Sequence, residues 1–443
     1  TLCRSGGRFY RKAMNRKILA LALPNIISNI TVPLLGLVDI AIVGHLGDDS
    51  LIGGIAIGTA VFNFIYWNFA FLRMGASGCT AQAYGARNFT EIASVFVRAL
   101  ILALAAALLL VVFQRPIGHA VFLLMDGTPH TMSYAADYFY ARIWAAPATI
   151  SMFAFHGWYI GMQNSRFPMY ISIGVNVVNL IFCLWFALGL GWGIVGVAWG
   201  TVVAQYSGLV LSIVLWGVYY RRFLRYIRIR ECLKLDALLA FFKINRDIFL
   251  RTACIVVVYT FFTSASSGMG DTMLAVNTLL MQLFTLFSYL MDGFAYAGES
   301  LAGRYTGAHN VQALNRCVRL LLVWGGVVAV LYTGIYAFGW RTVLSLFTES
   351  PAILSEAGGY VGWLIAIPLV AFIPFTIDGI LIGATRTTVM RDSVFLSTAL
   401  FFAVYYGFRS VIGNNALWAA FLLFLIARGI LQYFMTHRLK IIV

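Results

Sequence analysis

Charged side chains are scarce in this chain. Only 11% of its 443 residues are Asp, Glu, Lys or Arg, whereas 61% are hydrophobic. The mean hydropathy is +0.87. A soluble domain of this length needs a charged surface, so the composition excludes a soluble globular protein and indicates that lipid surrounds the chain.

Motifs for disulfides, metals and enzymatic nucleophiles are missing as well. The six cysteines form no CxxC and do not pair with histidines, which argues against a disulfide framework and a zinc site. HExxH and GxSxG motifs are absent, and the six histidines are dispersed. We therefore predict neither an enzyme nor a bound cofactor. No small-residue cleavage site follows the basic start, so we expect the first helix to be retained.

Long apolar segments are what the sequence has in quantity. About 20 apolar residues cross a hydrocarbon core of roughly 30 Å as a helix. The runs lack the alternation of a barrel strand, so we predict an all-α integral membrane protein. Turn signals separate twelve predicted spans: 17–43, 51–79, 92–114, 134–160, 167–189, 193–217, 243–267, 271–302, 313–339, 352–382, 392–411 and 415–436.

The net charge of +15 comes mainly from tails and alternate loops. The loop at 44–50 has no Lys or Arg, whereas 221–243 is rich in Arg. By the positive-inside rule we expect both termini to be cytoplasmic. The basic segment is expected to lie along the anionic membrane face and not to bind nucleic acid. Four arginines do not fit this topology: Arg115, Arg142, Arg341 and Arg409.

Two motifs recur at one spacing. YGARN at 84–88 returns as TGAHN at 306–310, and GWYIG at 157–161 returns as GILIG at 379–383. The offsets 307 − 85 and 379 − 157 are both 222. A duplicated six-helix unit in parallel orientation explains this. We predict an N-lobe at 1–218, a basic linker at 219–242 and a C-lobe at 243–443.

Asp39 is the clearest ionisable residue within a predicted span. A charge there costs about 2.5–3.5 kcal/mol, so its presence needs a reason. A helical rise of about 1.5 Å per residue places it in the outer half of the first span. Its apolar neighbours favour the neutral carboxyl, which can then bind and release a proton near neutral pH. Binding of Na⁺ or of a cationic substrate, or a packing role, stays open.

Pro24 and Pro33 lie in the same predicted helix as Asp39. Each proline removes a backbone donor and clashes with the preceding turn, so we expect a bend near each. A bend near Asp39 would couple protonation of its carboxyl to the conformation of this helix. A static kink is the alternative.

Polar residues in the fifth and sixth spans could serve Asp39. Helical spacing places Asn176, Asn179 and Cys183 on nearly one face of the fifth span. Thr201 and Gln205 share a face of the sixth. Amides and hydroxyls can bond a carboxyl in either protonation state or offer oxygen to a small cation. Interhelical packing is the rival interpretation.

Acids of the second half define a candidate second cation site. Asp292 and Asp378 each have apolar neighbours within a predicted span. Glu299 lies nearer the cytoplasmic end, where a salt bridge to Arg304 is the simpler expectation. The ionisable residues singled out within spans are thus mostly acidic.

Three segments resemble one known family. LALPNIISNITVPLLGLVD at 21–39, followed by GHL at 44–46, is similar to the start of DinF-type MATE (multidrug and toxic compound extrusion) transporters. DGFAYA at 292–297 and DGILIGATR at 378–386 also resemble them. The likeness covers nearly the whole chain.

The resemblance implies a protein of the bacterial inner membrane with two six-helix lobes around a central cavity, acting as a monomer. Inward H⁺ or Na⁺ would drive export of organic cations by alternating access. Asp39 matches the family's proton acceptor, Asn179 a polar partner and Thr201 a hydroxyl, and the first helix bends near a proline like Pro24. Some members carry a second Asp where this chain has Cys183. A buried thiol keeps its proton, so coupling is expected mainly at Asp39.

Two other functions stay open. One is Na⁺-coupled antiport through Asp292 and Asp378. The other is a lipid-carrier flippase, which should have a basic central cavity for pyrophosphate. We expect no metal site in any of these cases.

Overall fold

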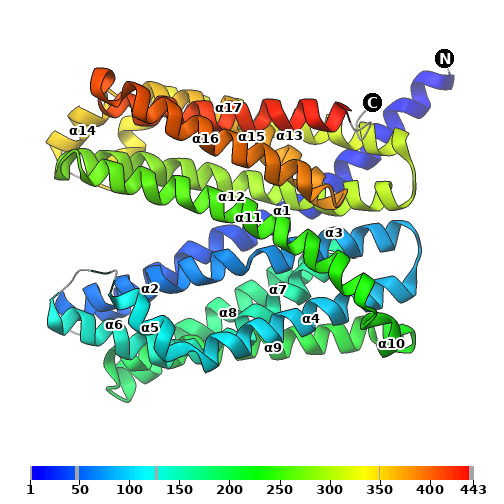
Figure 1. Ribbon diagram of the computed structural model, residues 1–443, viewed down its shortest axis with the longest axis horizontal. Helices are drawn as coiled ribbons and strands as arrows, with labels where there is room; N and C mark the ends of the chain where they lie inside the picture. Colours follow the sequence, from blue (N-terminus) through cyan, green and yellow to red (C-terminus); the bar gives the residue numbers. More distant parts are fainter. Residues whose placement is uncertain (1, 45–48, 124, 126–127, 349, 439–443) are drawn as a thin grey trace. The chain divides into compact units, whose positions relative to one another are not determined.

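The structure is a computed structural model that describes residues 2–44, 49–123, 125, 128–348 and 350–438. The described part is helical and contains no strand (Figure 1). Helices of the first half are α1 (Leu2–Gly44), α2 (Asp49–Phe69), α3 (Phe71–Gly85), α4 (Phe89–Val112), α5 (Gln114–Phe122), α6 (Pro129–Arg142), α7 (Ala146–Gly161), α8 (Arg166–Leu184) and α9 (Gly193–Tyr219).

Helices of the second half begin with the short α10. They are α10 (Ile229–Cys232), α11 (Leu235–Ser267), α12 (Asp271–Gly307), α13 (Val311–Ser345), α14 (Pro351–Ala357), α15 (Val361–Gly383), α16 (Thr387–Ile412) and α17 (Asn414–Arg438). Three short segments of other helix types lie between the α-helices. They are the 3-10 helices η1 (Ile143–Ala145) and η3 (Arg221–Tyr226) and the π-helix η2 (Trp185–Gly189).

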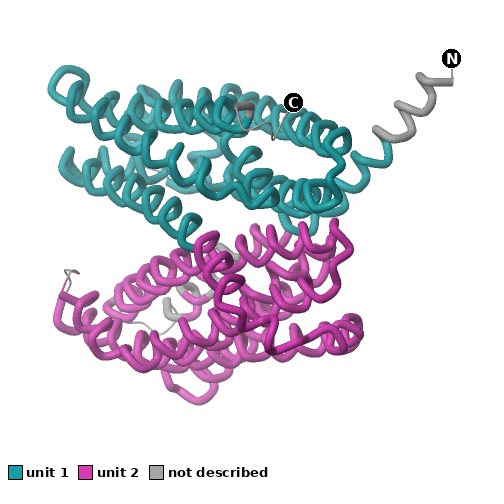
Figure 2. The backbone as a smooth tube through the Cα atoms, turned by 45° about the vertical axis from the view of Figure 1, so that its right-hand side comes forward, with its two compact units in different colours: residues 1–26, 246–443 teal, residues 27–245 magenta. Residues whose placement is uncertain are grey.

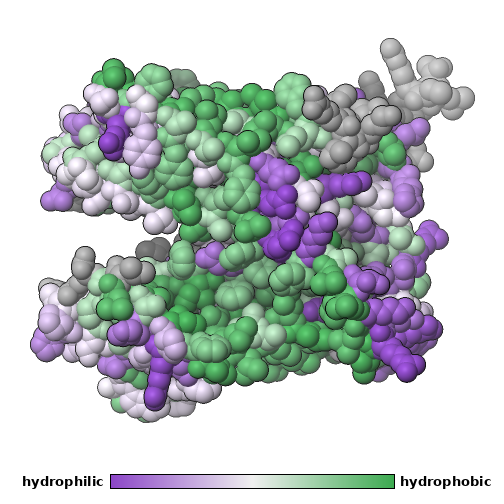
Figure 3. All heavy atoms as spheres, in the orientation of Figure 1, coloured by the Kyte–Doolittle hydropathy of each residue, from purple (hydrophilic) through white to green (hydrophobic). Residues whose placement is uncertain are grey.

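The helical membrane fold predicted from the sequence is confirmed. In the part of the chain that is described, ten helical segments are long and apolar enough to cross a membrane. Two of the predicted spans are not among them: 17–43, which lies in α1, and 134–160, which η1 divides into α6 and α7. Figure 3 shows hydrophobic side chains over the long helices and hydrophilic ones gathered mainly toward their ends.

The chain forms two compact units (Figure 2). Unit 1 comprises residues 1–26 and 246–443, and unit 2 comprises residues 27–245. These bounds differ from the predicted lobes at 1–218 and 243–443. Residues 1–26 belong with the second half because Leu21 and Ala22 pack against Phe294 and Leu301. The segment predicted as a separate linker, 219–242, belongs to unit 2.

Backbone geometry repeats at the spacing found in the sequence. Arg87 and His309 have φ values of 54° and 52°, and Gln163 and Thr385 have values of 65° and 52°. The differences 309 − 87 and 385 − 163 are both 222. Positive φ is uncommon for residues other than glycine. Its recurrence at one offset confirms the predicted duplication.

Glycines hold the same helix pair together in each unit. A Cβ on Gly157 of α7 would lie 2.2 Å from the Arg73 carbonyl oxygen of α3. A Cβ on Gly379 of α15 would lie 2.2 Å from the Ala295 carbonyl oxygen of α12. Small residues allow membrane helices to approach this closely.

We therefore expect Gly157→Ala and Gly379→Ala each to destabilise the protein by about 1–3 kcal/mol, because the added methyl group meets backbone that cannot move aside. Thermal unfolding of the purified protein measures this. Gly334→Ala is the matched control, since a Cβ there meets nothing within 4 Å. Equal melting temperatures for Gly157→Ala and Gly334→Ala would contradict the close contact.

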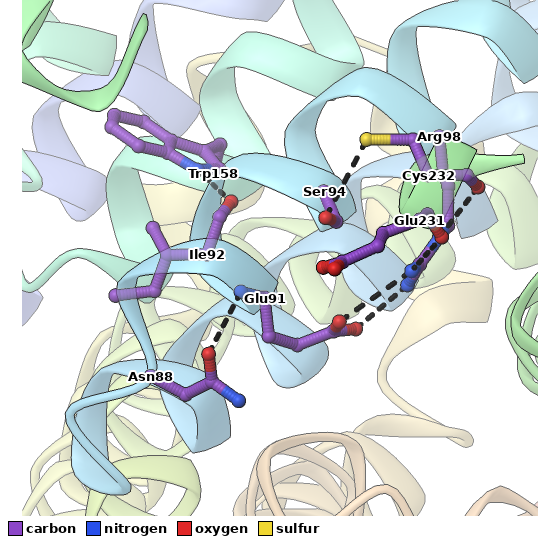
Figure 4. Close-up of polar contacts among 8 residues, drawn as sticks. All are labelled: Asn88, Glu91, Ile92, Ser94, Arg98, Trp158, Glu231 and Cys232. Carbon is purple, nitrogen blue, oxygen red and sulfur yellow. Dashed lines mark hydrogen bonds and ion pairs between the residues drawn. The ribbon is translucent and has the colours of Figure 1, made fainter. Parts of the chain in front are cut away.

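Arg98 of α4 fixes the basic segment to unit 2 (Figure 4). Its Nη1 donates to Glu91 Oε1 at 2.7 Å, and its Nε donates to the Cys232 carbonyl oxygen at 3.1 Å. Cys232 Sγ donates in turn to Ser94 Oγ at 3.5 Å. Arg98 thereby satisfies a terminal carbonyl group of α10 and holds this short helix against α4.

Arg98→Ala should release this segment and speed its cleavage by chymotrypsin by roughly fivefold or more, because local opening exposes the backbone. The rate is followed on the purified protein by gel electrophoresis. Arg228→Gln is the control, since its pair with Glu231 is exposed and contributes little. Unchanged cleavage in Arg98→Ala would mean that other contacts hold α10.

Candidate functional site

Asp39 is buried in unit 2. It lies on α1 and is 1% exposed. Its Oδ1 is 3.8 Å from Cys183 Sγ on α8, the distance of a weak thiol hydrogen bond. No second hydrogen bond to Asp39 occurs among the residues that the structure describes. The carboxyl is thus held loosely in a setting where an ionised group is costly.

Polar groups from α8 and α9 extend from Cys183 in a chain. Cys183 Sγ lies 4.0 Å from Thr201 Oγ1, which accepts a hydrogen bond of 3.0 Å from Asn179 Nδ2. Thr201 Oγ1 itself donates to the Val197 carbonyl oxygen at 3.1 Å. The structure therefore brings together Asp39, Asn179, Thr201 and Cys183, as the sequence analysis had grouped them.

Local geometry explains why these helices meet here. Asn179 and Cys183 are four residues apart and share one face of α8. Gly200 on α9 faces them, and a Cβ there would lie 2.6 Å from Cys183 Sγ. The side chain at position 183 therefore occupies a tightly bounded space.

One acceptor of this group is unused. Asn179 is fully buried, and within the described chain its Oδ1 has no hydrogen-bond donor. Most buried polar atoms in proteins are paired. An unpaired amide oxygen near a carboxyl offers a second oxygen to a proton-bearing or cationic group.

The remaining predicted residues lie differently. Asn176 Nδ2 donates to the Thr31 carbonyl oxygen at 3.0 Å, so it contacts the backbone of α1. Gln205 is partly exposed, one turn beyond Thr201 on α9. Pro24 lies within α1. Pro33 also lies within α1, and its side chain is outside the described part of the structure.

The sequence analysis missed Arg142. This buried residue at the end of α6 donates through Nη1 to the Tyr138 hydroxyl, and its guanidinium lies 5.0 Å from the ring centre of Phe62. The Arg142 guanidinium interacts favourably with the Asp39 carboxylate by electrostatic attraction. Arg142 had been treated only as an exception to the topology. Its place between aromatic residues inside the predicted span 134–160 was the available signal.

The carboxylate of Asp378 is paired with basic and amide side chains. Its carboxylate accepts hydrogen bonds from Arg251 of α11 and Arg428 of α17, and Gln432 Nε2 donates to Oδ1 at 2.6 Å. Two guanidinium groups would repel a metal cation, so this placement argues against the predicted cation site at Asp378. Arg142 and Arg428 are buried within spans as well, so the ionisable residues there include bases in addition to the acids singled out from the sequence.

Asp292, the other residue of the predicted second cation site, is partly buried on α12. The Asp292 carboxylate interacts electrostatically with the side chains of Tyr259 and Tyr289. Among the described residues, no cluster of three or more His, Cys, Asp or Glu side chains could hold a metal ion.

A MatE family model matches residues 24–185 and 248–406, which is more than half of the chain. The chain belongs to the MATE family. The MATE match has one part in each half, in agreement with the duplication. The family includes transporters, and this MATE protein is a multi-pass membrane protein.

Individual relatives support the same assignment. The MATE chain is 34% identical to DNA damage-inducible protein F of Escherichia coli (strain K12), over 93% of this chain and 89% of that protein. It is 25% identical to a probable multidrug resistance protein NorM of Deinococcus radiodurans, over 90% and 89% of the two chains. A crystal structure of MATE in the bent conformation shares the fold, with a TM-score of 0.87 at 19% identity over 97% and 96% of the chains.

Thr201→Val should lower stability by about 1 kcal/mol, because it leaves the buried Asn179 amide without its acceptor. Thr201→Ser retains the hydroxyl and should behave as the wild type. Thermal unfolding of the three purified proteins makes the comparison. If Thr201→Val and Thr201→Ser have the same melting temperature, the hydrogen bond between Asn179 and Thr201 does not stabilise unit 2.

Proposed function

We propose that this MATE protein exports organic, cationic or amphipathic drugs in exchange for protons, and that Asp39 carries the proton. The burial of Asp39 at 1% exposure is the observation that supports this most directly. An ionisable group inside a membrane helix is expected to be functional, and a carboxyl there can exist in both protonation states. The protein would act in a bacterial inner membrane with both termini cytoplasmic.

In the proposed cycle, the ionised Asp39 is balanced by the charge of Arg142 and by the bound cation. A proton arriving from outside neutralises the carboxyl and removes its attraction for the cation, which then leaves outward. The thiol of Cys183 can donate to the carboxylate but cannot replace it as a proton carrier, because it has no readily lost proton. Deprotonation toward the cytoplasm resets the carrier.

The conformational step is assigned to α1. Pro24 removes one backbone hydrogen bond of this helix, and Asn25 Nδ2 donates to the Leu21 carbonyl oxygen at 2.9 Å in the same turn. Asn176 holds the backbone of α1 at Thr31. A bend near Pro24 would move Asp39 relative to this anchor. The crystal structure of a MATE in the bent conformation is consistent with such a step.

Asp39→Asn should reduce ethidium uptake into everted vesicles at least tenfold, when an acid interior drives transport without Na⁺, because the amide cannot exchange a proton. Asp292→Asn is the control and should retain uptake. Membrane levels of each variant are checked by immunoblotting.

Equal uptake by wild type and Asp39→Asn would refute proton coupling at Asp39. Uptake that requires Na⁺ and is lost in Asp292→Asn would instead indicate Na⁺ antiport. Absence of transport by the wild type would exclude ethidium-like cations as substrates.

A further inference from the structure

The connection between α9 and α11 forms an exposed basic surface on unit 2. We name residues 221–235 the interfacial segment, which runs from η3 through α10 to the start of α11. Six of its residues are Lys or Arg and one is Glu, so its net charge is +5. The six basic side chains are all exposed: Arg221, Arg222, Arg225, Arg228, Arg230 and Lys234.

Most of these cations have no counter-charge in the protein. Arg228 forms an exposed ion pair with Glu231 at 3.2 Å, and the Arg222 guanidinium lies 5.4 Å from the ring centre of Phe223. The other four form no ion pair or side-chain hydrogen bond with any residue that the structure describes. They are Arg221, Arg225, Arg230 and Lys234. Their N–H groups are therefore free to bind a ligand.

Large aliphatic side chains are exposed beside the cations. Ile229 and Leu235 are 68% and 69% exposed, and Leu224 and Leu233 are exposed as well. Basic and aliphatic side chains occur together in segments that lie in the membrane interface, where the bases contact headgroups and the aliphatic groups contact acyl chains. This composition favours lipid over water as the neighbour of the interfacial segment.

The inner side of the interfacial segment is fixed to the protein. Phe223 is buried, and its ring centre lies 5.6 Å from that of Trp158 of α7. Cys232 is also buried, and its carbonyl oxygen accepts the hydrogen bond from Arg98 of α4 (Figure 4). The cations therefore belong to a segment that is held against α4 and α7.

The helices on either side place this segment at a membrane surface. Both α9, which precedes it, and α11, which follows it, are long and apolar enough to cross a membrane. Tyr219 at the end of α9 is 63% exposed, and tyrosine is enriched where helices leave the bilayer. A group of four to eight Lys or Arg residues next to a membrane helix is attracted to anionic lipids.

We propose that the interfacial segment is a binding site for anionic phospholipids. The four cations without a counter-charge bind the headgroup phosphates, because guanidinium and ammonium groups form charge-assisted hydrogen bonds with phosphate oxygens. The exposed aliphatic side chains contact the acyl chains. Zwitterionic lipids bind more weakly, since their own ammonium group balances the phosphate. Because Phe223 and Cys232 fix the segment, the bound lipid stabilises unit 2.

The test is thermal unfolding of the purified full chain in a neutral detergent with dihexanoylphosphatidylglycerol, dihexanoylphosphatidylcholine or sodium phosphate. The glycerol lipid is expected to raise the melting temperature by a few degrees in a saturable manner, because it binds the folded protein. The choline lipid and sodium phosphate at the same concentration are expected to have much smaller effects. Equal effects of the two lipids would overturn the proposal, and an equal effect of sodium phosphate would identify a free anion as the ligand instead.

A triple variant tests the location of the site. Arg221→Gln, Arg225→Gln and Arg230→Gln together should remove at least half of the rise, because they remove three of the proposed ligands. The matched control also loses three exposed arginines, but from α5, α13 and α16. It combines Arg115→Gln, Arg341→Gln and Arg409→Gln and should respond as the wild type.

Salt provides a second measurement that needs no variant. Raising NaCl from about 0.1 M to about 1 M shortens the screening length from about 10 Å to about 3 Å and should reduce the rise in the wild type. A full response in the triple variant, or an equal loss in the control variant, would overturn the proposal. If the triple variant does not fold, a rise that is independent of salt would overturn it. The assay involves no transport, so its outcome is independent of proton coupling at Asp39.

Discussion

Every polar group within a membrane span must find its partner inside the protein, because the surrounding lipid offers none. This constraint organises the structure from the backbone to the sites. It selects helices over other structures, and it places the arginines of the spans against carboxylates, hydroxyls and aromatic rings. It also gives weight to buried polar atoms that have no hydrogen-bond partner among the described residues, such as Asn179 Oδ1 and Arg428 Nε.

The two halves share a backbone but differ in their polar chemistry. In unit 2 the acid Asp39 lies beside the thiol of Cys183. The residues 222 positions later are Phe261 and Tyr405, whose rings pack at right angles 5.1 Å apart. In unit 1 the charges gather instead around Asp378. The duplication therefore supplies two scaffolds, of which one carries the candidate proton site and the other the buried charged group around Asp378.

The sequence predicted the helical fold, the duplication and the grouping of Asp39 with Asn179 and Thr201. The fold and the duplication depend on apolar runs and motif spacing, whereas the grouping of Asp39 with Asn179 and Thr201, on three different helices, came from the family resemblance. It did not predict the partners of Asp378, because Arg251 and Arg428 are 127 and 50 residues away along the chain. In sequence analysis, arginines are used mainly to assign loops to the cytoplasmic side. Only the packing of the helices shows that a particular arginine is buried within a span. The division between the two units falls inside α1, between residues 26 and 27, where a continuous helix carries no change of composition.

The glycine contacts at Gly157 and Gly379 also bear on how such a protein evolves. Each contact leaves no room for a methyl group, so glycine is required at both positions for steric reasons. Polar positions such as Asp39 and Asp378 are free of that restriction and have diverged between the copies. After gene duplication, the halves thus inherited a fixed architecture and could acquire new ligand chemistry independently, one repeat at a time.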